Sequence, residues 1–268
     1  MNESILEIHN LEYAFDDRLL FSSLNFRVHE KTITSVVGSN GSGKTTFMKI
    51  LGGLIFTEDM IKIGDMSLNA KTLPAYKKKV SYVDFSSMKF SQTTVYDEIY
   101  SQTNFTKWST EKKEKQLQKA LYELDLLSYK DKNPSRLSKR NKIMLKLAKA
   151  FVFSPKVLVM EFDDLNLTKE DKDLVFKILK SYIEKGLSVI YATNNSEDIL
   201  YSNRMIVLHK GKIAIEGSTS SVLKKDSLLL KLGIELPFMV DLSLKLKFYD
   251  VISKIYLNEE ELVNKLWK

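Results

Sequence analysis

The feature that most constrains the fold of this 268-residue chain is a glycine-rich segment, Gly38-Ser39-Asn40-Gly41-Ser42-Gly43-Lys44-Thr45. The segment satisfies the pattern G-x-x-x-x-G-K-[ST] in full. The β-branched run before it, from Ile33 to Val37, predicts a buried strand, and a helix is predicted after it from about Thr45 to Leu54. A strand, a glycine-rich turn and a helix in this order form a P-loop.

The P-loop predicts that the chain binds the phosphates of a nucleotide. Its glycines let the backbone bend until N–H groups converge on phosphate oxygens, and the helix N-terminus adds partial positive charge. Lys44 supplies a full charge, and the Thr45 hydroxyl can ligate Mg²⁺. We therefore expect the nucleotide to be held by the turn and the start of the helix: Gly38, Ser39, Asn40, Gly41, Ser42, Gly43, Lys44, Thr45 and Thr46.

Composition excludes several other classes of protein. The chain has no cysteine, which excludes disulfide scaffolds, thiolate metal sites and thiol catalysis. No run of about 18 apolar residues predicts a membrane span, and no signal sequence is expected. The net charge of +7 favours anionic partners, although a solvated lysine-rich surface explains it equally well.

Short apolar runs alternate with helical patterns along the rest of the chain. Residues 157–160 and 189–192 predict buried strands, separated by a helix over about 169–185. Residues 205–216 predict a hairpin, and the first strand, 5–15, is predicted at a sheet edge. We therefore predict an α/β fold with a mainly parallel sheet, helices on both faces and an antiparallel β edge.

The chain divides into two parts by the character of its sequence. Residues 1–218 are predicted to form one domain with a helical insertion at about 86–152, and residues 219–268 a small, mostly helical C-terminal appendage. Asn258 before three glutamates predicts a capped helix near the end, whereas segment 242–248 fits a strand and a helix equally well. The appendage is a candidate dimerisation element.

The order of these motifs resembles that of the nucleotide-binding subunits of ABC transporters over nearly the whole chain. Phe15 ends the first strand and the P-loop follows it; segment 133–138, Asn-Pro-Ser-Arg-Leu-Ser, then opens a helix, and Glu161 ends a later apolar strand. Within that family, the tail segments 230–238 and 259–268 are most similar to the ATPase subunits of energy-coupling factor transporters. The resemblance implies a P-loop ABC-type ATPase domain that binds ATP with Mg²⁺.

The resemblance also implies roles for residues outside the P-loop. Phe15 would stack on adenine, although a place in the core is an equal alternative from the sequence. Ser138 would contact the γ-phosphate held by an opposing subunit, and Glu161 would join Thr45 as a Mg²⁺ ligand. The implied partners are a second ABC ATPase subunit in a heterodimer, an integral membrane coupling protein and a substrate-binding membrane subunit. The chain would lie at the cytoplasmic face of the cell membrane, peripheral through these partners, and no nucleic-acid partner is expected.

The sequence departs from the family pattern at reacting positions. The family's Leu-Ser-Gly-Gly-Gln is Leu-Ser-Lys-Arg-Asn at 137–141, which weakens the expected contact across subunits unless the basic pair merely begins a helix. The family's Asp-Glu pair is Glu161-Phe162 here, and a phenylalanine cannot accept a proton. Asp163 points to the same side as Glu161 in an extended chain and is therefore an alternative base. Catalysis tolerates little misplacement of a base, which counts against this alternative.

Three further family positions are changed. Asn194 replaces a histidine that contacts the γ-phosphate, Asp84 or Phe85 stands where a glutamine is expected, and Thr168 replaces an acid. We therefore predict an ATP-binding subunit of an uptake transporter with weak or absent hydrolysis at its own site, and we assign no catalytic residue. The alternative is an ATP-binding regulator or scaffold without transport. A nucleic-acid-associated ABC ATPase is disfavoured, because such proteins usually join two ATP domains in one chain.

Overall fold

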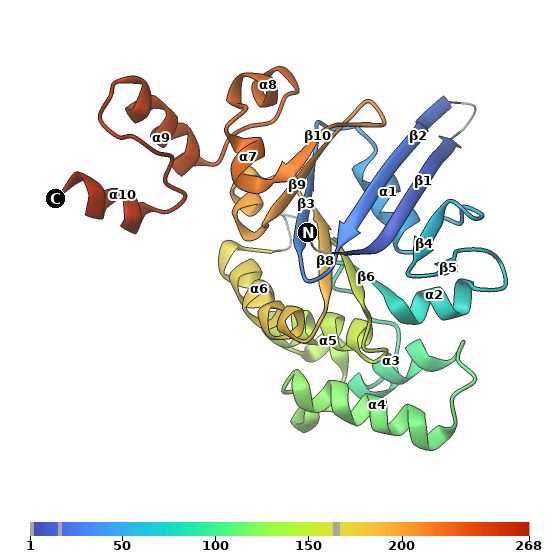
Figure 1. The fold of residues 1–268 in the computed structure, drawn as a ribbon. Coiled ribbons are helices and arrows are strands. Elements are labelled where there is room, and N and C mark those ends of the chain that lie inside the picture. Colours follow the sequence, from blue (N-terminus) through green and yellow to red (C-terminus); the bar gives the residue numbers. More distant parts are fainter. Residues whose placement is uncertain (1–2, 16–17, 163–166, 268) are drawn as a thin grey trace.

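The fold is built on a six-stranded sheet (Figure 1). The computed structural model describes residues 3–15, 18–162 and 167–267. Five strands of this sheet are parallel, and β10 alone runs antiparallel to its neighbour β9. In pairing order the strands are β10 (Lys212–Ser218), β9 (Arg204–His209), β3 (Ile33–Val37), β8 (Ser188–Ala192), β7 (Val157–Glu161) and β6 (Val80–Asp84).

A second sheet of four antiparallel strands lies beside the first. Its order is β2 (Arg18–His29), β1 (Ser4–Phe15), β4 (Ile61–Ile63) and β5 (Met66–Ser67). The prediction that the first strand lies at an edge is wrong, because β1 pairs with β2 on one side and with β4 on the other. Its imperfect alternation has a different cause: the pairing with β2 contains several register shifts.

The six-stranded sheet is covered on both faces, as the βα alternation predicts. Helix α1 (Lys44–Leu51) and the second sheet share one apolar cluster with one face of its strands. Helices α5 (Lys139–Phe151) and α6 (Lys169–Glu184) share another cluster with the opposite face. The carboxyl ends of β3, β7 and β8 therefore emerge between these layers, where ligands usually bind in α/β folds.

The segment between β6 and β7 is helical. It contains α3 (Val95–Tyr100), α4 (Thr110–Glu123) and α5, which Figure 1 shows below the sheet. Leu117 and Leu121 of α4, four residues apart, are fully buried in the same cluster as α5 and form the packed face of this helix. The other short helices of the N-terminal part are α2 (Leu73–Lys79), η1 (Ser101–Thr103), η2 (Leu127–Tyr129), η3 (Pro134–Arg136) and η4 (Ser196–Tyr201).

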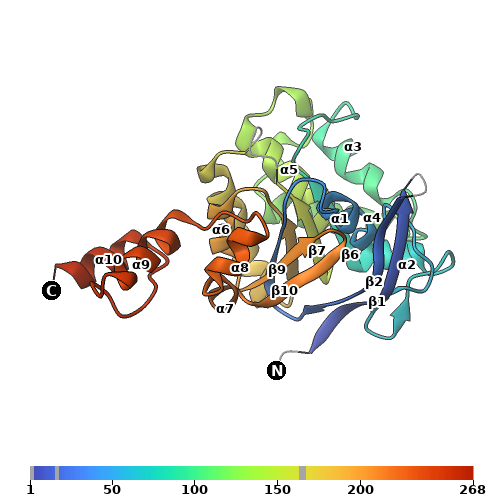
Figure 2. The same ribbon diagram turned by 90° about the horizontal axis from the view of Figure 1, so that it is seen from above.

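The C-terminal residues form four helices, α7 (Thr219–Leu223), α8 (Asp226–Lys231), α9 (Phe238–Phe248) and α10 (Glu259–Leu266). Segment 242–248 is thus a helix. Asn258 caps α10 by accepting a hydrogen bond from the Glu261 N–H at 2.9 Å. Helices α9 and α10 extend away from the sheet in both views (Figures 1 and 2) and share a small core of Met239, Ile252, Tyr256 and Leu262. Within the described parts of the chain, no helix has the length and apolar character needed to cross a membrane.

Candidate nucleotide-binding site

The P-loop joins β3 to α1, as predicted, and two of its glycines have backbone conformations that other residues rarely adopt. Gly41 and Gly43 have φ angles of 76° and 100°. Gly38 is required for another reason, since a Cβ there would lie 2.3 Å from the carbonyl oxygen of Leu208. The glycines of the motif therefore fix the path of the turn around an anion-sized concavity.

Lys44 folds back over this turn. Its Nζ donates to the carbonyl oxygens of Gly38, at 2.6 Å, and Ser39, at 3.2 Å. Burial lowers the pKa of Lys44, because the surrounding protein solvates its charge less well than water does. The Ser42 hydroxyl, 3% exposed, has no hydrogen-bond partner among the described residues. A poorly solvated cation and an unpartnered donor at one turn fit a bound polyanion.

Glu161 and Thr45 come together at the end of β7. Burial raises the pKa of Glu161, and hydrogen bonding from the Tyr82 hydroxyl acts in the opposite direction and lowers it. The nearby Asp84 carboxylate raises it further, and hydrogen bonding from Thr45 lowers it. A hydroxyl and a carboxylate this close are the oxygen donors that a phosphate-bound Mg²⁺ takes from a protein. Thr46 follows in the first turn of α1, half-buried.

Two predicted nucleotide contacts lie on other elements. Phe15 is the last residue of β1 and is 64% exposed, so the core alternative for its ring is wrong. Ser138 caps α5, and its Oγ accepts from the Asn141 N–H at 3.2 Å. Ser138 lines a cavity that contains no P-loop residue. It therefore stands apart from the nucleotide site of its own chain.

Lys139, the residue after Ser138, has a partner within its own chain. The Lys139 ammonium lies 2.6 Å from the Asp171 carboxylate. Asp171 also completes a capping box with Thr168 at the start of α6. Lys139 therefore begins α5, and its side chain is directed toward the start of α6.

Phe162 and Asn194 differ in their surroundings. The Phe162 ring packs among aromatic side chains, 5.8 Å from the Phe85 ring. Asn194 is exposed and shares a cavity of about 290 Å³ with Ser39 of the P-loop and Glu235 of the C-terminal part. Asp163, the alternative base, lies outside the described residues.

Sequence reasoning missed a buried ion pair behind the site. Lys172 of α6, 2% exposed, lies 2.7 Å from the Asp198 carboxylate. Asp198 also accepts from the Thr193 hydroxyl at 2.6 Å, and Thr193 accepts from the Asn195 N–H. This network holds the turn that carries Asn194. No local sequence pattern predicts this network, because its residues come from segments that are separated in the sequence.

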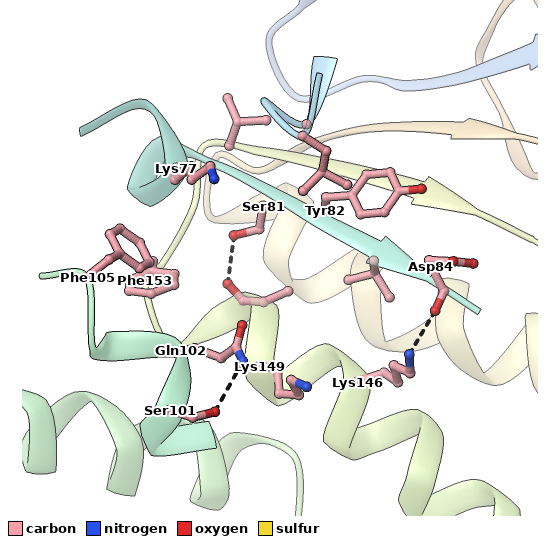
Figure 3. A pocket seen from close by; sticks show the side chains of 15 residues that line it. Lys77, Ser81, Tyr82, Asp84, Ser101, Gln102, Phe105, Lys146, Lys149 and Phe153 are labelled. Carbon is pink, nitrogen blue, oxygen red and sulfur yellow. Dashed lines mark hydrogen bonds between the residues drawn. The ribbon is translucent and has the colours of Figure 1, made fainter. Parts of the chain in front are cut away.

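A cavity of about 450 Å³ was also missed; it lies between β6 and α5 and is shown in Figure 3. Lys146 of α5 donates to the Asp84 carbonyl oxygen at 3.0 Å, and Lys149 lies beside it. Phe105 and Phe153 pack against each other at one end, with ring centroids 5.4 Å apart. The lysine-rich composition of the chain indicates positive charge and does not predict this cavity.

The chain is similar to known proteins over nearly its whole length. It is 29% identical to the energy-coupling factor transporter ATP-binding protein EcfA1 of Oenococcus oeni over 98% of both chains. It is 26% identical to the EcfA1 of Listeria monocytogenes, over 100% of this chain and 98% of that one.

Solved structures share its fold. CbiO1 of Clostridium perfringens, part of the ABC transporter complex cbiONQ, superposes with a TM-score of 0.72 at 21% identity, covering 87% of this chain and 96% of that one. A nucleotide-free ATP-binding cassette of an ABC transporter gives 0.72 at 18% identity, over 86% and 98% of the two chains. The ABC transporter family model matches residues 21–161, from β2 through the P-loop to Glu161 at the end of β7. The chain belongs to the ABC transporter family.

Proposed function

We propose that this chain is an ATP-binding subunit of an energy-coupling-factor-type uptake transporter. It binds MgATP at a dimer interface to drive a membrane coupling protein, and its own site hydrolyses ATP slowly or not at all. The P-loop with its folded-back Lys44 carries the binding part of this proposal. The full-length similarity to EcfA1 proteins supports the transport part. The chain would lie at the cytoplasmic face of the membrane, held by its partners.

ATP binding would be shared between two polypeptides. The turn at 38–45 would hold the phosphates, Phe15 the adenine, and Thr45 with Glu161 the Mg²⁺, which supplies charge neutralisation at the phosphates. Ser138 would cap the site of the opposing ATPase subunit. Its separation from the P-loop of its own chain supports that assignment, and so does the Lys139–Asp171 ion pair, which draws the lysine aside.

Hydrolysis at this chain's own site is expected to be weak because position 162 has no proton acceptor. The loss of a general base typically lowers a rate by about 10²–10⁴-fold. The packing of the partly buried Phe162 ring against Phe176 and Tyr191 supports this expectation. The opposing subunit would then carry most of the turnover, and we infer that the pair is a heterodimer, since a homodimer would have the same defect twice.

The cavity of Figure 3 is our candidate for the contact with the membrane coupling protein. Its aromatic end and its lysines suit a helical segment that brings apolar side chains and acidic groups. Burial lowers the pKa of Lys146 and the neighbouring Lys149 lowers it further, while Asp84 and Glu98 raise it. Lys149 is itself paired with Glu98, so Lys146 is the cation that an acidic partner would meet. Lys146 lies on α5, the helix that begins after Ser138, so docking and ATP sandwiching would act on one rigid element.

The test uses the complex purified from solubilised membranes, with partners identified by mass. The catalytic glutamate of the second ATPase subunit is replaced by glutamine in that complex. We expect ATPase activity to fall to background although this chain is unaltered and still binds ATP. Activity that persists would refute the division of labour. Purification without an integral membrane protein would favour the alternative, a regulator or scaffold that uses ATP as a ligand.

A further inference from the structure

Lysine side chains gather around one tryptophan beside the cavity of Figure 3. The Lys78 ammonium, in the last turn of α2, lies 5.6 Å from the centroid of the Trp108 ring. The Lys112 ammonium, in the first turn of α4, lies 4.9 Å from the same centroid. Trp108 is half-buried and Lys112 is exposed. Two separate helices therefore bring positive charge to one indole, whose ring face attracts cations.

This surface is continuous with the aromatic end of the cavity. The Trp108 ring lies 5.6 Å from the Phe153 ring, which packs against Phe105. Phe105 is 44% exposed and lines the cavity together with Lys77, at the end where Figure 3 labels Phe153. The tryptophan and its two lysines do not line the cavity. A segment that fills the cavity would therefore leave them uncovered.

The basic aromatic patch, as we call this surface, consists of Lys77, Lys78, Phe105, Trp108 and Lys112. Within the described parts of the chain, no carboxylate lies within 4 Å of its three ammonium groups. Glu114, one turn along α4, accepts from the Tyr96 hydroxyl at 2.6 Å and from the Gln118 amide at 2.7 Å. The patch therefore combines positive charge that has no partner in this chain with partly exposed aromatic rings.

We propose that the basic aromatic patch contacts a membrane surface that contains anionic lipids. The inference takes its orientation from the proposed function, since the neighbouring cavity would hold a segment of the membrane coupling protein. Lysines attract anionic headgroups, and their apolar stems can cover the rings beside them. A tryptophan suits the same boundary, because most of its ring is apolar and its N–H is polar.

The position of the patch favours lipid over other anionic partners. A surface beside a cavity that faces the membrane is next to headgroups, whereas a nucleic acid has no access there. An acidic protein segment would occupy the cavity itself, where Lys146 lies. The isolated chain, tested in the absence of any membrane protein, separates lipid binding from protein binding.

The first test measures sedimentation of the purified full-length chain with vesicles. One kind contains equal parts of phosphatidylglycerol and phosphatidylcholine, and the other contains phosphatidylcholine alone. We expect binding to the anionic vesicles only, and its loss at high salt, since salt screens exposed charges. The triple variant Lys77→Gln/Lys78→Gln/Lys112→Gln should bind at least about tenfold more weakly, because each lysine near an anionic surface contributes several-fold in affinity.

The matched control is Lys169→Gln/Lys177→Gln/Lys180→Gln. It lowers the net charge from +7 to +4, as the first triple variant does, but at exposed positions of α6. Helices α6 and α2 lie on opposite sides of the molecule in both views (Figures 1 and 2). The control should bind anionic vesicles within about twofold of the unaltered chain, because charges far from the contact are screened. Normal ATP binding by both triple variants shows that they are folded.

The second test uses fluorescence to locate the contact. The chain has two tryptophans, so Trp267→Phe leaves Trp108 as the only indole. Anionic vesicles should shift the emission of Trp108 to shorter wavelength, because the indole moves from water into the headgroup region. Phosphatidylcholine vesicles should leave the emission unchanged.

Several results would overturn the lipid contact. They are no binding to anionic vesicles, equal binding to both kinds of vesicle, equal losses in the two triple variants, and an unshifted Trp108 emission. If a single-stranded oligonucleotide binds through the three lysines of the patch and anionic vesicles do not, the patch is a nucleic-acid surface instead.

The proposed function is tested separately, by the purification from solubilised membranes. A chain that purifies with an integral membrane protein but does not bind anionic vesicles refutes the lipid contact alone. A chain that binds anionic vesicles through the patch but purifies with no membrane protein refutes the proposed function and retains the lipid contact.

Discussion

At the scale of single residues, the carboxylate of Glu161 decides how the site responds to pH. Burial raises its pKa, so it takes up a proton at a higher pH than an ordinary glutamate. Mg²⁺ needs the ionised form. As the pH falls through the raised pKa, the gain in ATP affinity that Mg²⁺ provides should be lost. Titrations of ATP with and without Mg²⁺ between pH 8 and about pH 5 measure this gain.

Glu161→Gln is the matched variant for this prediction. It should show little Mg²⁺ gain at any pH, and an identical pH profile in both proteins would contradict the assignment. The stability of the unliganded fold gives a second, independent prediction for Glu161→Gln. The raised pKa means that ionising Glu161 weakens the unliganded fold as the pH rises through that pKa. Without Mg²⁺, Glu161→Gln should therefore melt higher than the unaltered chain at pH 8, and the difference should narrow toward acid pH.

Lys44 gives the second residue-scale prediction. Lys44→Ala removes a cation from the P-loop, and hydrogen bonds to charged groups contribute roughly 1.5–3 kcal/mol, or about 10–100-fold in Kd. Calorimetric titration with ATP should show a loss of this size with little change in melting temperature. Lys62→Ala, an exposed lysine on β4, is the control and should bind ATP normally. A Kd within twofold of the unaltered chain in Lys44→Ala would contradict the site.

At the scale of elements, the turn between β9 and β10 supports the P-loop through β2. Gly211 has a φ of 73°, and a Cβ there would lie 1.6 Å from the Leu20 carbonyl oxygen. The next residue of β2, Phe21, in turn lies against Gly43, where a Cβ would be 3.0 Å from its ring. The hairpin, β2 and the P-loop are therefore stacked in one series of close contacts.

Gly211→Ala should consequently destabilise the fold and weaken ATP binding together. Left-handed strain and backbone overlap together cost roughly 2–5 kcal/mol. Gly64→Ala is the matched control, because Gly64 also has a positive φ, 55°, but its Cβ would meet nothing within 4 Å. It should cost only roughly 1–2 kcal/mol. Urea denaturation measures the free energy of unfolding of both variants. Equal losses would show that the left-handed backbone alone is responsible and that the contact with Leu20 does not contribute.

The elements also show which parts of the fold can be predicted from the sequence alone. Strand β3 has the predicted bounds because a β-branched run ending at a glycine needs no knowledge of its neighbours. The edge position of β1 failed because β4, later in the chain, covers its free side. The helix α9 was ambiguous because both periods place apolar residues on one face. The P-loop is a local pattern and could be predicted in full. The Lys172–Asp198 pair joins α6 to η4, and the Phe85–Phe162 pair depends on the register of β6 and β7, so neither could be predicted from the sequence.

At the scale of the whole molecule, the appendage exposes a set of large apolar side chains. Phe248, Tyr249 and Trp267 are 81%, 74% and 83% exposed. They belong to the part that extends away from the sheet in Figures 1 and 2. The Phe248 and Tyr249 rings contact each other, with centroids 5.3 Å apart, and large exposed apolar side chains on one appendage are typical of an interaction surface. This supports the proposal that residues 219–268 contact the second ATPase subunit.

The appendage is also tied to the nucleotide site. The Phe238 N–H, at the start of α9, donates to the Glu197 carboxylate at 2.6 Å, in the turn that carries Asn194. Gly233 lies beside the P-loop, where its Cβ would be 3.9 Å from that of Ser39. Pairing of two appendages would therefore orient two nucleotide sites toward each other before ATP closes them.

The double variant Phe248→Ser/Trp267→Ser tests this arrangement. It should lower the affinity between the two ATPase subunits at least tenfold, because buried aromatic side chains carry much of the binding energy at such interfaces. ATP binding by the isolated chain should not change, since neither residue is near the P-loop. Tyr122→Ser, on the exposed side of α4, removes an aromatic that is 75% exposed and should leave assembly intact. Light scattering of the purified pair measures the affinity, and undiminished assembly of the double variant would exclude the appendage as the dimerisation element.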